Sequence, residues 1–252
     1  MKNIFSLALL FVLLTLSSKA VTRGDIKVIE ASEDIRYLSQ KLAKDYLFFY
    51  KYPKQKSMKQ QLEKSLYKLT DDIRTIATTT KDIDTKDILE FLAYSKDQIS
   101  DIFDKKPDED KAALMLDYSE TLLEGADSIS TRHQYDFSEE ENMLMVTKKM
   151  EYLLERITKY YMAVNIGFNT LTNQEAMQKA IQKFEDNMNP VNLYIYPDEQ
   201  LSLQVKLTSS WETNKTFFLQ SKELFIPLLM FNSVDYLENM ISILSLYHSK
   251  NQ

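Results

Sequence analysis

Arg36 has the surroundings in this sequence that best suit the binding of a small ligand. At helical spacing it shares a face with Ser39, Gln40 and Ala43, which are small or polar. A second helix can approach such a face closely, and a guanidinium that faces a close-packed copy of itself needs an anion. The pattern therefore predicts a site for a small anion at Arg36, with Tyr37 and Gln40 as further ligand-binding residues.

A purely structural role for Arg36 is the alternative. Glu33 lies three residues earlier, so the two side chains can form an ion pair on a solvated helix face, worth about 0.2–0.5 kcal/mol. In that case replacing Arg36 with alanine is harmless. The sequence leaves both interpretations open.

Other residue types that carry chemistry lack the spacing of a known site. The two histidines, His133 and His248, have no acidic residues at metal-ligand spacing. Segment 82–87 lacks the glycine and the terminal glutamate of a calcium loop, so it predicts a helix cap. Nucleophile motifs and glycine-rich phosphate loops are absent from the sequence, and Trp211 is predicted to be a packing residue. We therefore expect a protein that is not an enzyme and uses no metal or cofactor.

The elements that position these residues are predicted to be long helices. Apolar residues recur every three or four positions over 35–49 and 146–168, and the whole chain has only 3 glycines and 5 prolines. Segment 191–196 alternates like a strand, but one isolated strand cannot pair, so we expect an extended connection there. Start and stop signals give eight helices, near residues 25–52, 55–79, 85–104, 107–130, 138–169, 173–189, 197–222 and 233–249.

The chain also repeats itself. Residues 37–47 align without a gap on 152–162, sharing Tyr, Leu, Lys and Tyr at matched places. Further on, Tyr94 falls opposite Trp211, and segment 117–120 falls opposite 235–238. Because these anchors keep their order and nearly their spacing, the pattern predicts a duplicated module. We expect an all-α fold of two tandem antiparallel four-helix-bundle modules, residues 21–131 and 132–252.

Residues 1–20 have the pattern of a cleaved signal peptide. Lys2 precedes an apolar run over 4–16, and small residues stand at Ser18 and Ala20, three and one places before the expected cut. The run is shorter than the roughly 20 residues of a transmembrane helix. The mature chain is therefore expected in the periplasm or secreted, in a bacterial envelope.

The amino-acid composition limits the classes of molecule that this protein can bind. Removal of residues 1–20 takes two lysines from a chain of formal charge −6, and the remainder has no basic block. An acidic surface of this kind excludes nucleic acid as a partner. The sequence has 0 cysteines, which rules out a lipoprotein and disulfide bonds, so stability must come from a hydrophobic core.

The segment 34–44 resembles a known family. It is similar to the N-terminal sensory domain of type IV pili methyl-accepting chemotaxis transducers, the PilJ-type domain, and to the periplasmic domain of nitrate/nitrite sensor kinases. The resemblance implies a four-helix bundle outside the membrane; in the nitrate sensors the arginine contributes to an anion site between two subunits. The residues that carry the resemblance are Arg36, Leu38, Ser39, Gln40 and Lys41.

These observations predict an exported, non-enzymatic protein of sensory type that binds a small ligand or docks on a receptor. Proteins of the resembling family continue into a transmembrane helix and an output domain that this sequence lacks, so we expect it to act with a partner. The expected partners are a small anion, a membrane chemoreceptor or sensor kinase, and a second copy in a homodimer. The alternative is a structural or scaffolding helical protein of the envelope with no small-molecule ligand.

Overall fold

All regular structure in the described part of the chain is helical, as predicted. The computed structural model describes residues 23–133, 135–220 and 223–252. The predicted signal peptide, residues 1–20, lies outside them. The first half contains α2 (Arg23–Lys51), α3 (Lys56–Thr79), α4 (Ile83–Phe103) and α5 (Glu109–Arg132). The second half contains α6 (Glu139–Asn165), α7 (Leu171–Leu193), α8 (Asp198–Leu219) and α9 (Pro227–Lys250).

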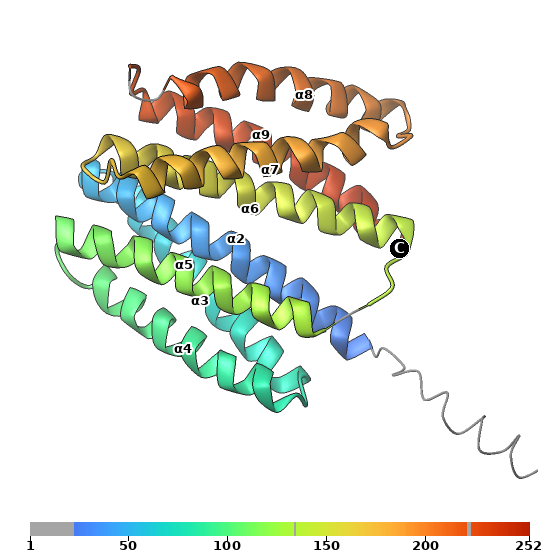
Figure 1. Cartoon of the computed structure of the whole chain (residues 1–252), viewed down its shortest axis with the longest axis horizontal. Helices are drawn as coiled ribbons and strands as arrows, with labels where there is room; N and C mark the ends of the chain where they lie inside the picture. Colours follow the sequence, from blue (N-terminus) through green and yellow to red (C-terminus); the bar gives the residue numbers. More distant parts are fainter. Residues whose placement is uncertain (1–22, 134, 221–222) are drawn as a thin grey trace, which may run out of the picture.

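Each half closes into a ring of four helices. In the first, α2 packs on α3 and α5, and α4 packs on the same two helices; in the second, α6 packs on α7 and α9, with α8 between those two. The halves meet where α2 and α6 lie side by side (Figure 1). These two helices run in the same direction, because Asp34 contacts Lys148 and, further along, Lys44 contacts Glu155. One hydrophobic core extends through both halves.

Local signals in the sequence explain where several helices begin. Ser138 and Glu141 form a reciprocal capping box at the start of α6. Asp82 accepts a hydrogen bond from the Thr85 amide at the start of α4, which confirms the predicted helix cap in segment 82–87. Gly167, with a φ of 127°, makes the turn after α6 in a conformation that favours glycine.

The predicted extended connection at 191–196 is wrong for its first half, because α7 continues through Pro190 to Leu193. Proline is tolerated there because hydrogen bonds from Tyr194 and from α8 stabilise the last turn. The Pro190 carbonyl accepts from the Tyr194 amide at 3.0 Å, and Gln204 of α8 donates to the Val191 carbonyl at 2.9 Å. Buried Val191 adds apolar contact to this turn.

The predicted start of the last helix at residue 233 is also wrong, since α9 begins at Pro227. Proline suits the first helical position, where its missing N–H is not needed. The extra turn places Met230 and Phe231 in the core, at 0% and 7% exposure. That apolar burial favours helix over loop in this segment.

Trp211 is a packing residue, as predicted, with 0% exposure and its ring centroid 4.1 Å from that of Phe184. Tyr94, its predicted counterpart in the first half, is 60% exposed, so the two positions do not correspond in burial. Among the described residues, no helix combines the length and the apolar content needed to cross a bilayer.

Candidate ligand-binding pocket

The Arg36 guanidinium faces two carboxylates. It pairs with Glu33 of its own helix and with Asp127 of α5. The arginine side chain is 12% exposed and that of Glu33 is 3% exposed, so this pair lies in the interior rather than on the solvated face considered above. Burial alone would lower the pKa of Arg36, but Glu33 and Asp127 raise it above its ordinary value. The positive charge of Arg36 is therefore already neutralised within the protein.

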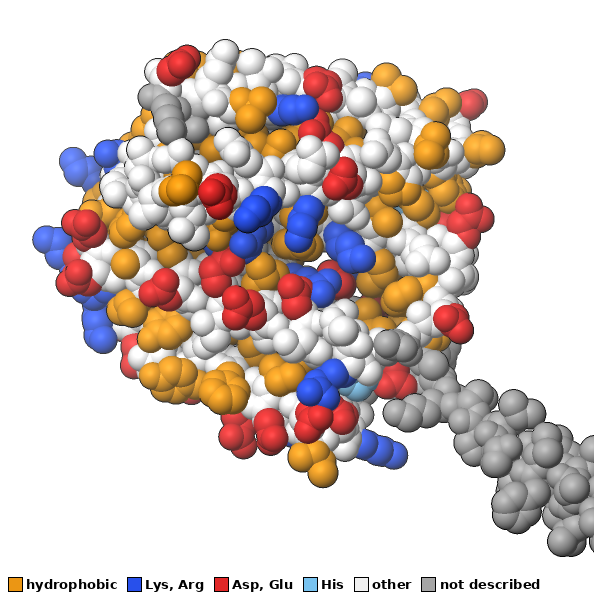
Figure 2. Space-filling view, in the orientation of Figure 1, with side chains coloured by type: hydrophobic (Ala, Val, Ile, Leu, Met, Phe, Trp, Pro, Cys, Tyr) orange, Lys and Arg blue, Asp and Glu red, His pale blue; other side chains and the backbone are white. Residues whose placement is uncertain are grey.

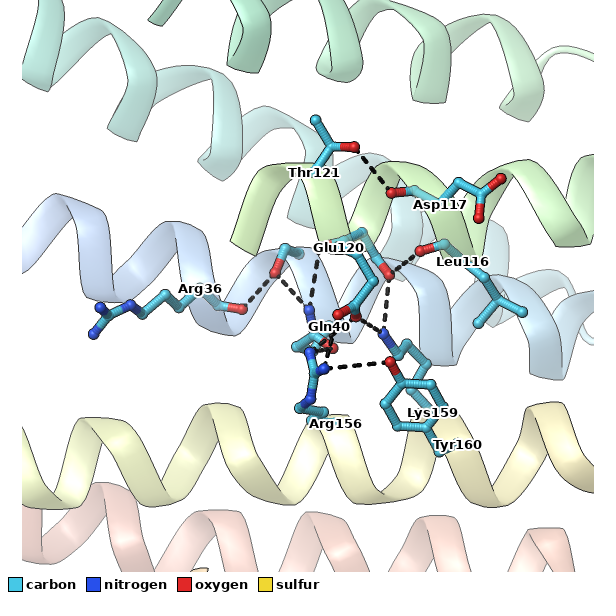
Figure 3. A network of polar contacts seen from close by, with 11 residues as sticks. Arg36, Gln40, Leu116, Asp117, Glu120, Thr121, Arg156, Lys159 and Tyr160 are labelled. Atoms are coloured by element: carbon cyan, nitrogen blue, oxygen red, sulfur yellow. Dashed lines mark hydrogen bonds and ion pairs between the residues drawn. The ribbon is translucent and has the colours of Figure 1, made fainter. Parts of the chain in front are cut away.

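Gln40 belongs to a separate network that joins α2, α5 and α6 (Figure 3). Its amide donates to the Ser119 carbonyl at 3.2 Å and accepts from Arg156 at 3.3 Å. Arg156 also holds both carboxylate oxygens of Glu120, at 2.9 and 2.7 Å. Figure 3 shows the Arg36 guanidinium pointing away from this network. Gln40 therefore bridges helices, and the structure does not bring it together with the charged end of Arg36.

Lys159 completes this network and is fully buried. Burial lowers the pKa of Lys159 to about 8, although its ion pair with Glu120 opposes the shift. Burial opposes ionisation of Glu120 as well, but Lys159 and Arg156 hold the pKa of that carboxyl at about 2. Figure 2 shows acidic and basic side chains gathered in the middle of one face, where the two halves meet.

Tyr37 lies elsewhere, in the wall of a pocket between α2, α3 and α9. The pocket has a volume of about 460 Å³. A second cavity of about 430 Å³ adjoins it, since both are lined by Tyr37, Lys68 and Asp235. The charged residues of the larger pocket are Lys41, Lys44, Asp45, Lys64, Lys68 and Asp235.

Two charged side chains in the pocket wall, Lys44 and Asp45, are each only 1% exposed. Lys44 pairs with Glu155 of α6 at 2.7 Å, and Lys41 reaches the same carboxylate at 3.1 Å. Asp45 lies 3.6 Å from the Lys44 ammonium and 3.5 Å from that of Lys41, and its Oδ2 atom has no hydrogen-bond donor among the described residues. Burial raises the pKa of Asp45 in spite of these two lysines.

Glu155 also interacts electrostatically with a second carboxyl, that of Glu238 on α9. Burial opposes ionisation of Glu155, but Lys41 and Lys44 hold its pKa at about 2. Burial and the charge of Glu155 raise the pKa of Glu238 well above its ordinary value.

The two buried clusters of lysine, arginine and glutamate were not predicted from the sequence, although the offset of the repeat contains a signal for them. Lys41 and Lys44 stand 115 residues before Arg156 and Lys159, the same offset that aligns Tyr37 with Tyr152. Each pair of basic residues contacts a glutamate across the junction of the halves. Lys41 and Lys44 contact Glu155, and Arg156 and Lys159 contact Glu120.

The two histidines repeat in the same way. His133 Nδ1 lies 2.8 Å from Asp25, and His248 Nδ1 lies 2.6 Å from Glu140. Both members of the second pair follow those of the first by 115 residues. Each contact joins the last helix of a half to the start of its first helix, as expected of a duplicated module.

No family model, no curated protein and no solved structure matches this chain. Lysines, carboxylates, amides and aromatic rings in one concave wall are suited to hold a small molecule by charge, hydrogen bonds and apolar contact.

Proposed function

We propose that this protein is an exported, non-enzymatic helical protein of sensory type, which binds a small molecule in the pocket between α2, α3 and α9. The observation that carries the proposal is the placement of the wholly buried Lys44 and Asp45 in the wall of a cavity of about 460 Å³. Burying charge is costly, and here both buried charges line an open cavity, where their polar atoms can also meet a ligand. Cavities of this size are typical of small-molecule sites.

The resemblance to PilJ-type sensory domains supports the sensory role and a location in the bacterial envelope. The proposal places the ligand at the Tyr37 side of α2 rather than at Arg36, because Glu33 and Asp127 already neutralise that guanidinium.

A thermal-shift screen against small anions, including nitrate and nitrite, and against common metabolites tests the proposal. A ligand at 100 times its Kd stabilises the protein by about 2.7 kcal/mol, which raises Tm by a few degrees. Gln61→Trp fills the pocket from the exposed side of α3, whereas Gln178→Trp makes the same change on the exposed side of α7. We expect a shift that Gln61→Trp abolishes and Gln178→Trp keeps.

Three other results would each be decisive. A shift that survives Gln61→Trp and is lost in Arg36→Ala would place the ligand at Arg36. A shift that survives both Gln61→Trp and Arg36→Ala would place the ligand elsewhere on the protein. The absence of a shift with every compound would favour the scaffolding role.

Docking on another protein is a second candidate function, favoured by the outer face of α9. Leu229, Tyr236 and Ile243 recur at seven-residue intervals and are 53%, 53% and 42% exposed. A seven-residue apolar repeat is typical of a helix that packs on another helix. A membrane chemoreceptor, a sensor kinase or a second copy of this chain fits such a face. Sedimentation velocity with and without Tyr236→Lys tests the second copy: self-association that the variant abolishes would support it, and a monomer at all concentrations would exclude it.

A further inference from the structure

The pocket changes in character along its length. At one end the rings of Phe48 and Phe231 lie with centroids 4.2 Å apart, and Met58 and Leu228 line the same wall. The other end, which the adjoining cavity shares, has Tyr37, Lys68 and Asp235. The order follows from the helices: Phe48 stands three turns beyond Tyr37 on α2, about 16 Å along its axis. A ligand that fills the pocket therefore needs an apolar part and a polar part.

Most charges in the wall already have partners. Lys41 and Lys44 pair with Glu155, and Lys68 pairs with Asp34 at 2.7 Å. Two charged side chains of the wall, Lys64 and Asp235, form no ion pair within the described part of the chain. The wall thus presents one unmatched charge of each sign.

Asp45 adds a second, independent observation. Its carboxyl is 1% exposed and lines the pocket between the apolar and the polar ends. Its Oδ2 lies 3.5 Å from the Lys41 ammonium but accepts no hydrogen bond from the described residues. A buried acceptor that is left without a donor costs free energy. A ligand that brings an N–H donor to this wall removes that cost.

We infer that the pocket binds a zwitterion with an apolar side chain, the chemistry of a free apolar α-amino acid. The ligand carboxylate pairs with Lys64, the ammonium group lies among Asp235 and Asp45, and the side chain lies against Phe48, Met58, Leu228 and Phe231. A simple anion leaves Asp235 without a counter-charge and Asp45 Oδ2 without a hydrogen bond, and a simple cation leaves Lys64 without a counter-charge. The inference rests on the proposed function, because it names the ligand class of the same pocket.

Titration calorimetry with matched compounds tests this inference. The probes are L-phenylalanine and L-leucine, 3-phenylpropionate, which lacks the amine, phenethylamine, which lacks the carboxylate, and glycine, which lacks the apolar part. We expect at least one of the two apolar amino acids to bind at least tenfold more tightly than each of the other three compounds.

Variants of the two unmatched residues locate the charges of the ligand. Lys64→Met and Asp235→Asn are both surface changes and should each weaken binding at least fivefold. Lys206→Met on α8 and Asp87→Asn on α4 are the matched exposed controls and should leave the Kd unchanged.

Each contrary result overturns a defined part of the argument. Equal affinity for 3-phenylpropionate or for phenethylamine would make the ligand an anion or a cation and would overturn the inference while the binding function stands. The same holds if neither amino acid binds but the compound screen finds a ligand that Gln61→Trp excludes. If no compound binds in either experiment, both the inference and the proposed function fail.

Discussion

Buried charge is concentrated where α2 meets α6. Lys44, Glu155 and Lys159 are all buried. Taking an ion out of water is costly, and a close opposite charge is needed to compensate. Sliding α2 by one turn would separate Lys44 from Glu155, so these ion pairs favour one register of the two helices.

Glu155→Gln tests this compensation. The substitution keeps the shape of the side chain and removes the negative charge that Lys41 and Lys44 share. We expect a loss of about 3–5 kcal/mol in the free energy of unfolding, because a buried charge is left without its partner. Urea denaturation measures the change. Glu90→Gln, at an exposed site of α4, is the control and should fall within about 0.5 kcal/mol of the wild type.

The raised pKa of Glu151 should make the free energy of unfolding fall as the pH rises, whereas most acids in folded proteins act in the opposite direction. Burial raises its pKa from 4.5 to about 7, with Asp34 adding to the shift and Lys148 opposing it. Such a group binds its proton more tightly in the folded state, so its stabilising effect is full below pH 4.5 and is lost as the pH rises to 7. Burial raises the pKa of Asp72 to about 6, which acts in the same direction.

The free energy of unfolding should therefore fall between pH 4.5 and 7.5, and it should fall less in Glu151→Gln. Urea titrations at both pH values measure the two differences. The depressed pKa values of Glu155 and Glu120, each about 2, act mainly below about pH 5, so they oppose the fall in stability only at the acid end of this window. Equal losses in the wild type and the variant would contradict the prediction.

For single residues, the sequence predicts ion pairs within one helix but not those between helices. The contact of Arg36 with Glu33 follows from helical spacing, but Asp127 lies 91 residues away and only the packing of α5 on α2 brings it near. Lys44 is a similar case. Lysine is almost always exposed, and Glu155, on another helix, supplies the closest counter-charge to its buried ammonium.

Gly125 of α5 packs closely against α4. A Cβ atom on this residue would lie 2.5 Å from Cδ2 of Leu92, which is itself fully buried. Gly125→Leu should therefore push the two helices apart and lower the free energy of unfolding by about 1–3 kcal/mol. Thermal denaturation followed by circular dichroism measures the loss. Glu124→Leu, one residue earlier and exposed, should not show it, and equal melting of the two variants would contradict the prediction.

The positions of the helices could be predicted because their apolar residues recur every three or four positions. The boundaries near prolines could not be predicted, because proline in a sequence usually indicates the end of a helix. Pro190 instead stands in the last turn of α7, and Pro227 stands at the first position of α9. Both placements depend on burial of the neighbouring residues, Val191 and Phe231, which the local sequence does not reveal.

The molecule as a whole is predicted to unfold in one step, because a single core and the ion pairs of α2 with α6 join its halves. The chain has 1 tryptophan, Trp211, which lies in the second half. Its fluorescence therefore reports on that half alone. Far-UV circular dichroism reports on both. The two urea transitions should coincide, and a separate tryptophan transition would show that the halves unfold independently.

The all-α architecture followed from composition and periodicity, but the way in which the two halves meet did not. The repeat offset indicated equivalent positions without showing that α2 and α6 would pack on each other. The boundaries at 131 and 132 stay a prediction, which the paired contacts of His133 and His248 support.

The side-by-side placement of α2 and α6 also affects how this junction can evolve. In a symmetric dimer of identical chains, one mutation changes both sides of the interface at once. Here each side is encoded separately. Glu155 can therefore face Lys41 and Lys44 while the equivalent position on α2, Gln40, stays uncharged and hydrogen-bonds to Arg156. One side of the junction can thus acquire a specificity of its own, beside the pocket, while the other continues to hold the halves together.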